Sequence, residues 1–449
     1  MTRLNLLILL GLLASLLACS PKGTEGEPAP QRSNEPEPFL PTGTIDLNLF
    51  PSGIQVTDTT SSSAYATVRW TNADSTTLTL YRADEDLGWK PVESVVLTPT
   101  SHQRVTHIFR GLMPDKAYTV VAHQGDAIYA SPTRFRTALD EDAARIVRFG
   151  ASSCVGRTQK PWPTLSRAAQ ERFDFFILAG DMVYADNSAT EENYRNVWNA
   201  SLGELGYRDL SASTSFVTTW DDHEVDNNWS WNDPEVSQWV APARRVYEEV
   251  MPWRHGPSAT NSIWRSIKWG RTLELFVLDS RGERRDGDYI SPEQLEWLKS
   301  GLSESQARFK VIVNSVPITD FDNWFGEVEA DDRWQGYPIQ REDILSHIET
   351  DDIEGVFWVS GDFHYTQLGR LALEEDALGG NQWEVLSGPA GSNINPLVTT
   401  GLLQANDQFP IILETWTYVA IELNPVTGVA KLEFIDGSGL LIAEYELDL

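Results

Sequence analysis

From about residue 145 onward, the hydrophobic and polar positions of this 449-residue chain follow an alternation of two kinds of segment. One kind is a short apolar run of strand length, and these runs span residues 146–151, 174–179, 215–220, 272–279, 309–316 and 355–360. Between them lie stretches with helical spacing, such as residues 292–298, where Pro292 stands at the expected helix start. Residues 414–449 return to strand-like runs around a turn at 424–428. This order predicts a layered α/β domain over residues 145–449.

Residues 44–140 instead show the two-residue alternation of β-strands, as in 65–70 and 76–81. A Leu-x-Pro-x-x-x-Tyr run from Leu112 to Tyr118 leads into one of these strands and resembles the tyrosine corner of fibronectin type III and related sandwiches. We therefore expect an all-β sandwich of the fibronectin III-like kind over residues 44–140. A β domain of another topology is the alternative, because such sandwiches are identified from pattern alone.

The first 19 residues have the pattern of an export signal. Residues 6–17 are apolar but too short to span a bilayer as a mature helix, and Arg3 precedes them. The sequence Leu-Leu-Ala-Cys ending at Cys19 predicts a lipoprotein signal peptide over residues 1–19, with Cys19 as the acylated N-terminus. An ordinary signal peptide cleaved nearby is the alternative. Residues 20–43, rich in Pro, Gly, Ser and Glu, are then a disordered tether, and the protein is exported and lipid-anchored in the periplasm or at the cell surface.

The formal net charge is −30, from 65 acidic and 35 basic residues. This balance argues against specific nucleic-acid binding, which needs a basic surface. A phosphate ester would have to be held by local metal ions and arginines instead. Once Cys19 is acylated, Cys154 is the remaining thiol and no internal disulfide can form. Cys154 is then either a buried small hydrophobe or a metal ligand.

Cys154 and three acidic clusters stand at the ends of predicted strands. The clusters are Gly-Asp-Met-Val-Tyr at 180–184, Asp-Asp-His-Glu-Val-Asp-Asn-Asn-Trp at 221–229, and Gly-Asp-Phe-His at 361–364. Strand ends in an α/β sheet converge on one edge, so these side chains can meet there. Taken singly, the shorter motifs could be polar turns. Together, thiolate, carboxylate, phenolate and imidazole predict a metal site, and the mixture of hard and soft donors indicates two different metals.

In this order and spacing, the motifs resemble those of the alkaline phosphatase D family of calcineurin-like metallophosphoesterases. Two further segments add to the resemblance: Leu-Asp-Ser-Arg at 278–281, and Asp-Arg-Trp-Gln-Gly-Tyr at 332–337 with Arg341 after it. The resemblance covers about residues 45–449, and the string at 221–229 is its most specific part. It implies an αββα sandwich for the catalytic domain, with a β-sandwich ahead of it.

The resemblance also implies a site that binds Fe³⁺ and Ca²⁺. Carried over by motif, the iron ligands would be Cys154, Asp181, Tyr184 and His364. The calcium ligands would be Asp181 as a bridge, Asp222, Asp362, and Asn227 or Asn228. His223 would face the phosphoryl group, and Arg157 and Arg281 would contact phosphate.

Two departures from related patterns bear on the metals. The broader superfamily begins with Asp-x-His and ends with Gly-His-x-His, where this chain has Cys154 and Gly361-Asp362-x-His364. This difference favours the D family over a site with two zinc or two manganese ions, which remain the alternative metals. Many D-family members use the twin-arginine export route, whereas no twin arginine precedes the apolar run here. The metals would then be acquired after export.

These inferences predict an exported phosphoesterase that acts as a monomer on small phosphodiesters, phosphomonoesters or both. Two cations would clamp the attacking and leaving oxygens and convert bound water to hydroxide. The alternative is a non-catalytic surface-binding lipoprotein with a degenerate hydrolase domain, in which exposed tryptophans stack on sugars. The candidates for such stacking are Trp229, Trp231, Trp239 and Trp253. The presence of a residue of the expected kind at every family position argues against this alternative.

Overall fold

The computed structural model describes residues 36–84, 88–258, 262–285, 287–321 and 330–449. The predicted signal peptide over residues 1–19, with Cys19, lies outside the described residues, as does the predicted tether up to residue 35. Both therefore stay predictions.

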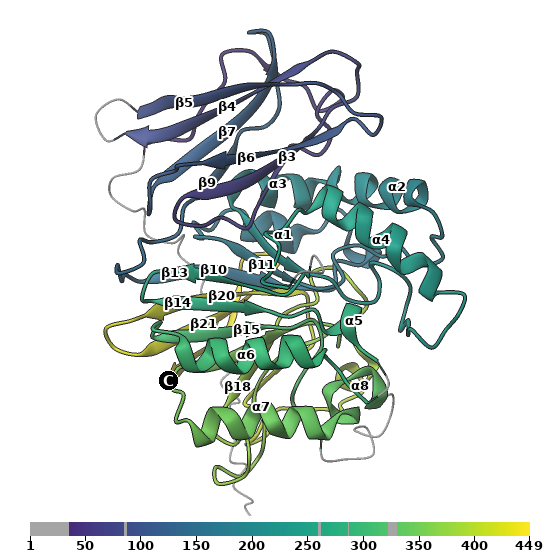
Figure 1. The fold of residues 1–449 in the computed structure, drawn as a ribbon, viewed down its shortest axis with the longest axis vertical. Coiled ribbons are helices and arrows are strands. Elements are labelled where there is room, and N and C mark those ends of the chain that lie inside the picture. The colour runs from purple at the N-terminus through teal and green to yellow at the C-terminus, as the bar shows by residue number, and fades with distance from the viewer. Residues whose placement is uncertain (1–35, 85–87, 259–261, 286, 322–329) are drawn as a thin grey trace, which may run out of the picture.

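Two sheets pack face to face to form the centre of the molecule (Figure 1). The first has the strand order β22 (Leu441–Asp448), β21 (Val429–Asp436), β20 (Thr417–Asn424), β10 (Val147–Ser152), β11 (Phe176–Ala179), β12 (Phe216–Thr219), β2 (Ile54–Thr57), β3 (Ser63–Arg69), β6 (Arg104–Arg110). The second has the order β13 (Arg265–Trp269), β14 (Leu273–Val277), β15 (Phe309–Val313), β16 (Val356–Ser360), β18 (Trp383–Leu386), β17 (Thr366–Arg370), β19 (Ile411–Leu413). The six apolar runs predicted as strands are β10, β11, β12, β14, β15 and β16.

The central strands read as continuous apolar runs because both of their faces are buried. In β14, Leu273, Leu275 and Val277 lie in the core between the two sheets, whereas Phe276 packs with the helices on the other face. In β16, Val359 and Trp358 divide in the same way. A one-residue shift in register would exchange these two sets, so the pattern of side chains fixes the register.

Helices cover both outer faces of the paired sheets. On the first sheet lie α1 (Pro163–Ala168), α2 (Glu191–Leu202), α3 (Leu205–Ser213) and α4 (Ser237–Val250). On the second sheet lie α6 (Pro292–Glu304) and α7 (Pro338–Thr350), which Figure 1 shows below it. Two short helices, α5 (Ser280–Glu283) and α8 (Pro396–Thr399), follow strand ends. The layer order is the αββα sandwich that was predicted.

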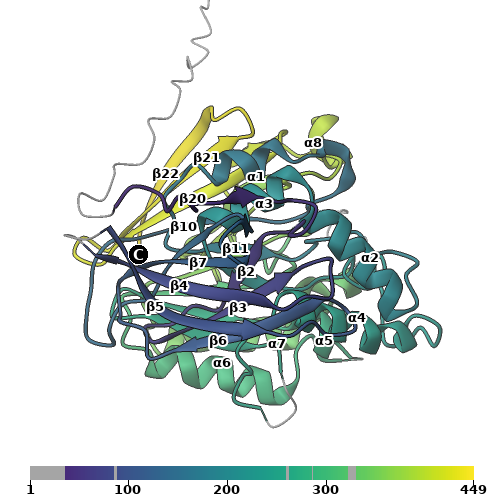
Figure 2. The ribbon, with the colours of Figure 1, turned by 90° about the horizontal axis from the view of Figure 1, so that it is seen from above.

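The N-terminal strands form a sandwich whose second sheet is not separate. One of its sheets has the order β1 (Thr44–Ile45), β8 (Ile128–Tyr129), β7 (Ala117–Gln124), β4 (Thr76–Asp84), β5 (Gly88–Leu97), with β9 (Thr133–Arg136) also paired to β7. The opposing strands β2, β3 and β6 continue the first catalytic sheet, because β2 pairs in parallel with β12 (Figure 2). The predicted domain boundary near residue 140 therefore separates two parts of the sequence but not two sheets, because one sheet contains strands from both sides of it.

The predicted tyrosine corner is present in geometry. The buried Tyr118 hydroxyl accepts a hydrogen bond from the Met113 amide at 2.9 Å. This is the backward bond from the tyrosine to the preceding turn that the Leu-x-Pro-x-x-x-Tyr pattern predicts. It secures the corner, while the fibronectin III-like class of the sandwich stays a prediction.

A buried ion pair joins the sandwich to the catalytic domain. Asp58, which follows β2, accepts hydrogen bonds from Arg265 Nε at 2.5 Å and Arg265 Nη2 at 2.6 Å. Arg265 also donates to the main-chain oxygens of Ile263 and Thr218. The side chains of the pair are 1% and 2% exposed, so water cannot replace a lost partner. The sandwich is thus held to β12 and β13 by charge as well as by the shared sheet.

We expect Asp58→Ala to lower the free energy of unfolding by about 3–5 kcal/mol, because it leaves the buried guanidinium of Arg265 unpaired. Chemical denaturation followed by tryptophan fluorescence measures the change. The matched control is Asp142→Ala, which breaks an ion pair with Arg271 at the exposed surface and should cost about 0–1 kcal/mol. Equal effects of the two substitutions would contradict the role assigned to the buried pair.

Candidate metal centre

The predicted ligands lie in loops that directly follow strands. Cys154, Asp181 and Asp362 each stand two residues beyond the end of β10, β11 and β16, respectively. Their φ angles are 53°, 53° and 71°, and that of His364 is 55°. Non-glycine residues adopt this left-handed region at a cost, and such residues gather at functional sites when the surrounding structure holds them there. The chain turns sharply at each strand end and aims the side chains at one edge.

Three overlapping groups of donor atoms form at this edge, each with its atoms within 4.8 Å of one another. The groups are Cys154, Asp181 and His364; Asp181, Asp222 and His223; and Asp181, Asp221, Asp222 and Asp362. Asp181 belongs to all three. Two adjoining sites that share one carboxylate are the arrangement needed for a bridged pair of cations. Asp221 was not predicted as a ligand, although it adjoins Asp222 in the sequence.

Unpaired oxygens show that the donor set fits metal ions. Asp181 Oδ1, Asp221 Oδ2 and Asp222 Oδ1 are buried and have no hydrogen-bond partner in the described structure. Burial raises the pKa of Asp221 to about 6 against the effect of Arg281, and it also raises the pKa of Asp222, Asp362 and the Cys154 thiol. Buried anions of one sign are unfavourable together unless cations lie among them. The oxygens therefore need the positive charge that metal ions would bring.

Tyr184 lies beside the group of donors that contains the Cys154 sulfur. Its hydroxyl is 3.1 Å from Asp181 Oδ2 and 2.8 Å from His364 Nε2, and it also contacts Ser392 Oγ. Ser392 Oγ donates to the carbonyl of Cys154 at 2.9 Å, so one serine ties the Tyr184 and Cys154 loops together. Ser392 was missed at the level of sequence, where Gly-Pro-Ala-Gly-Ser at 388–392 reads as an ordinary turn.

His223 is oriented by a carboxylate that the motif did not include. Its Nδ1 lies 2.6 Å from Asp186 Oδ1, and its ring lies against that of Tyr184 with centroids 3.9 Å apart. Burial by itself would lower the pKa of His223, but Asp181 and the hydrogen bond to Asp186 raise it to about 11. Since Nδ1 is engaged by Asp186, Nε2 is the nitrogen left to face the donor groups. The sequence signal that could have identified Asp186 is its position two residues after Tyr184, next to a predicted ligand motif.

The two predicted arginines occupy different places. Arg157 is exposed, and its Nη2 donates to the carbonyl of Tyr184 at 3.0 Å, at the rim of the site. Arg281 is 1% exposed and is held by Asp221 Oδ1 at 2.8 Å and Asp332 Oδ1 at 2.6 Å. We expected Arg281 to contact phosphate, and the structure corrects this. Its buried guanidinium is engaged by the carboxylates of Asp221 and Asp332. It positions Asp221 instead.

The side-chain amide predicted as a calcium ligand, that of Asn227 or Asn228, likewise does not lie at the metal centre. Asn227 and Asn228 are both exposed, and it is the main-chain N–H of Asn228 that donates to Asp222 Oδ2, at 2.6 Å. This bond turns the other oxygen of Asp222 toward the donor groups. Asn228 therefore supports the site through its backbone in this structure.

Sequence comparison places the chain among known proteins. Residues 149–408 match the sequence profile of the PhoD-like phosphatases, which is more than half of the 449 residues. The chain belongs to the PhoD-like phosphatase family. It is similar to alkaline phosphatase D of Bacillus subtilis (strain 168), with 26% identity over 316 residues, or 59% of this chain and 54% of that relative. The chain thus matches about half the length of this curated relative.

Solved structures share the fold of this PhoD-like chain. A solved structure of PhoD superposes with a TM-score of 0.75 and 20% identity, covering 92% of this chain and 90% of the other. Purple acid phosphatase PPD1 from yellow lupin seeds superposes with a TM-score of 0.62 and 13% identity, covering 88% and 73%. At these identities the likeness concerns the fold. It agrees with the αββα layers described above.

The tryptophans considered for sugar stacking are mostly part of the core of this PhoD-like chain. Trp229 and Trp253 are 2% and 1% exposed, and Trp231 and Trp239 pack partly buried against the same core. Two of the four candidates therefore cannot stack on a ligand at the surface. The binding-only alternative keeps Trp231 and Trp239 as its candidates for stacking.

Glu224 is the residue of the acidic string that holds the two central loops together. Its buried carboxylate accepts main-chain hydrogen bonds from Asp181, Met182, Val183 and Asp221 at 3.1, 2.5, 3.2 and 2.8 Å. Sequence reasoning grouped Glu224 with possible ligands. In the structure it is a positioning residue, because it fixes the loops that carry Asp181 and Asp222.

We expect Glu224→Gln to lower the free energy of unfolding by about 1–3 kcal/mol, because an amide presents one oxygen where the carboxylate presents two, and some of the four buried N–H groups lose their acceptor. Urea denaturation of the metal-free protein measures the loss. Glu235→Gln, at an exposed position on the following loop, is the control and should change stability by less than about 0.5 kcal/mol. A variant as stable as the control would refute the bridging role of Glu224.

Proposed function

We propose that this chain is a metal-dependent phosphoesterase that hydrolyses phosphodiesters in preference to phosphomonoesters. The observation that carries the proposal is the set of three donor groups sharing Asp181, with unpaired buried oxygens on Asp181, Asp221 and Asp222. Membership of the PhoD-like phosphatase family supports the same reaction class.

The donor types divide the site into two halves. Cys154, Tyr184 and His364 with Asp181 would hold Fe³⁺, because thiolate, phenolate and imidazole suit a transition metal. Asp222, Asp362 and Asp221 with Asp181 offer oxygen ligands alone, which suits Ca²⁺. Zinc or manganese in place of either ion is the alternative. When bound, the ions would supply Lewis acidity to the phosphoryl oxygens and an activated water.

The side chains around the ligands have separate tasks in this proposal. His223, fixed at Nδ1 by Asp186, turns Nε2 toward the reacting phosphoryl group and can donate a proton there. Arg157 at the rim can meet a substrate oxygen from the solvent side. Arg281 keeps Asp221 in place through the network with Asp332. None of these three roles needs a change of fold.

The preference for diesters follows from the scarcity of available positive charge. Arg281 is engaged by Asp221 and Asp332, and Arg284 Nη1 lies 2.7 Å from Asp332 Oδ1. A monoester carries an additional negative charge that several fixed cations would have to meet. Arg157 at the rim and Arg285 in the wall of the adjoining pocket are the other arginines that this proposal places near a bound ester. A singly charged diester suits this setting better.

A pocket of about 450 Å³ beside the donor groups can receive the second ester group. It is lined by Asn228, Trp231, Arg285 and Tyr337 among others. The main-chain N–H of Asn228 donates to Asp222 and so links this pocket to the donor groups. The Arg285 guanidinium lies 4.1 Å from the centroid of the Trp231 ring, which stiffens this wall. The pocket is therefore suited to the leaving group of a diester.

Purified protein tests the proposal in two measurements. Elemental analysis should find iron and calcium, and chelation should stop turnover until Ca²⁺ is restored, with Mg²⁺ less effective. The kcat/KM for bis-p-nitrophenyl phosphate should exceed that for p-nitrophenyl phosphate. Turnover of neither ester by metal-loaded protein would overturn the function, whereas a strong preference for the monoester would overturn the diester assignment alone.

We also propose that the enzyme acts as an exported, lipid-anchored monomer, with Cys19 acylated and residues 20–43 as the tether. The support is the sequence Leu-Leu-Ala-Cys after an apolar run. Within the described residues, no helix combines the length and apolar character needed to cross a membrane. Mass spectrometry of the mature N-terminus tests the anchor, and an unmodified N-terminus at another residue would exclude it.

A further inference from the structure

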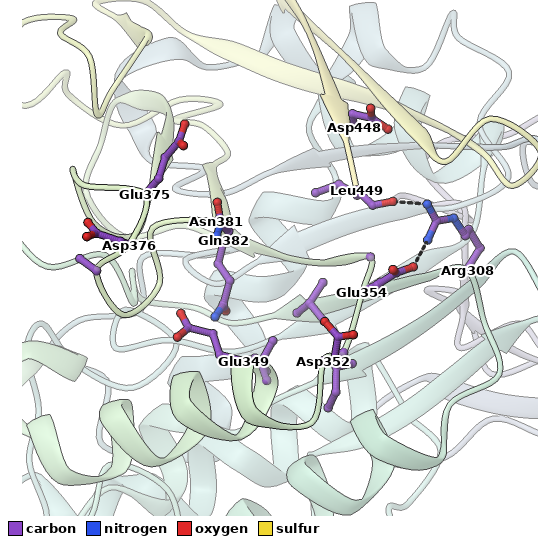
Figure 3. Close-up of a pocket in the computed structure, with 15 residues that line it drawn as sticks. Arg308, Glu349, Asp352, Glu354, Glu375, Asp376, Asn381, Gln382, Asp448 and Leu449 are labelled. Carbon is purple, nitrogen blue, oxygen red and sulfur yellow. Dashed lines mark hydrogen bonds and ion pairs between the residues drawn. The ribbon is translucent and has the colours of Figure 1, made fainter.

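A second pocket, of about 620 Å³, lies at the opposite end of β16 from the metal centre (Figure 3). Gly355 and Val356, at the start of β16, line it, whereas Asp362 follows the other end of this five-residue strand. The remaining walls come from the end of α7, the loop at 375–382 and the end of β22. The pocket is therefore separate from the donor groups described above, and the proposed reaction does not use it.

The lining of this pocket is strongly acidic. Its carboxylates come from Glu349, Asp352, Glu354, Glu375, Asp376 and Asp448. The basic side chain in the lining, Arg308, is engaged by Glu354 Oε2 at 3.1 Å and by the main-chain oxygen of Leu449. The C-terminal end of α7 also faces the pocket and adds its negative dipole. These charges together favour a cationic ligand.

Gln382 supplies a second, independent observation at this pocket. Its side chain is buried, with 4% of the residue exposed, and neither the amide nitrogen nor the amide oxygen has a hydrogen-bond partner in the described structure. Figure 3 shows the side chain extending into the pocket toward Glu349. Buried amides are almost always paired, so an unpaired one that faces a pocket indicates a partner outside the chain. That partner must both donate and accept a hydrogen bond.

The spacing of the acids argues against a single metal ion as the ligand. Among the described residues, the groups of three or more acidic, histidine or cysteine donors close enough to bind one ion all lie at the metal centre. The carboxylates of this pocket are spread around its walls instead. Several separate positive charges on an extended molecule can reach them, whereas one ion cannot.

We propose that this pocket binds a short basic peptide segment containing lysine or arginine. A peptide group offers one N–H and one carbonyl, which match the oxygen and the nitrogen of the Gln382 amide. The basic side chains then meet Glu349, Asp352 and Asp376, while Glu375, which lies 3.6 Å from Arg370, is a shared partner. A polyamine carries similar charge but has no carbonyl to accept from the Gln382 amide nitrogen. The amide thus selects a peptide over other polycations.

Binding of the capped peptide acetyl-Lys-Gly-Lys-amide to the full chain tests the proposal. We expect saturable binding by calorimetry, and Gln382→Leu should weaken it by about tenfold or more, because the substitution removes both hydrogen bonds and leaves the charge unchanged. Spermidine should bind more weakly, with an affinity that Gln382→Leu does not change. Asp407→Asn, at an exposed position outside the pocket, should leave peptide binding unchanged.

Several results would overturn the proposal. Peptide affinity unchanged by Gln382→Leu would mean non-specific attraction to an acidic protein. Equal affinity for spermidine, or displacement of the peptide by Ca²⁺ alone at similar concentrations, would point to a general cation site. If Gln382→Leu does not fold, the double variant Glu375→Gln, Asp376→Asn at exposed positions in the pocket decides. It must weaken the peptide more than Glu235→Gln, Asp407→Asn, which removes the same charge at exposed positions outside the pocket.

Discussion

Replacing Asp181 by asparagine is expected to reduce kcat by about 10³-fold or more, because the ions of a two-metal site supply several kcal/mol of transition-state stabilisation. Asp181 is the one residue common to all three donor groups. An amide keeps the volume but offers one neutral oxygen in place of two charged ones. Both metal positions should therefore lose affinity together. Elemental analysis of the purified variant and kcat measured with bis-p-nitrophenyl phosphate test this.

The control for Asp181→Asn is Asp209→Asn. Asp209 also accepts a hydrogen bond, from Ser166 at 2.7 Å, but it lies on α3 away from the donor groups. We expect this variant to keep its metals and its kcat. If Asp181→Asn retains one of the two metals in full, Asp181 is a ligand of a single ion and the bridged arrangement is wrong.

The second large effect is expected for Cys154→Ala, which should remove iron and abolish turnover while the fold remains. The Cys154 side chain is 1% exposed, and its sulfur is close to Asp181 and His364. Burial and the nearby carboxylates Asp181 and Asp362 raise the pKa of the thiol in the absence of metal, although the hydrogen bond between the thiol and Ser153 opposes them. A metal ion would reverse this balance by binding the thiolate. Iron content and kcat report the change directly.

Val155→Ala separates the ligand role of Cys154 from a packing role. Val155 is the next residue, is equally buried, and belongs to the apolar core rather than the donor groups. We expect this variant to be less stable but to keep its iron and its turnover. If Cys154→Ala behaves in the same way, with metal and activity retained, Cys154 is a small buried hydrophobe and the proposed iron site lacks its sulfur ligand.

Much of the metal centre could be predicted from the sequence because strand ends meet at one edge of a sheet. Cys154, Asp181 and Asp362 each follow an apolar run at the same short distance, and the structure brings them together with Asp222, His223, Tyr184 and His364. The strand-end pattern predicted that these residue types meet, and the family resemblance assigned their separate roles, which stay predictions. The residues are aimed by the strand that precedes them, and the length of that strand is visible in the sequence.

Other site residues could not be assigned in this way, because their roles depend on contacts between distant segments. Arg281 follows β14 and looked like a phosphate ligand, yet the 60 residues that separate it from Asp221 fold so that the two form a buried pair. Ser392 joins two loops from far along the chain. Glu224 resembled a ligand by composition and is instead an acceptor for four main-chain N–H groups.

The sequence by itself determined the order of strands and helices, a layered α/β domain, the tyrosine corner and the residue types of the metal centre, because periodicity and short motifs are local properties. The αββα order of the layers followed from the family resemblance. Tertiary structure alone decided that β2, β3 and β6 extend the catalytic sheet, since one parallel contact between β2 and β12 joins segments about 160 residues apart. It also decided which carboxylates keep unpaired oxygens and which, like Asp332 and Asp186, are engaged by an arginine or a histidine. Pairing between buried charges depends on distance and burial, and neither is written in the local pattern.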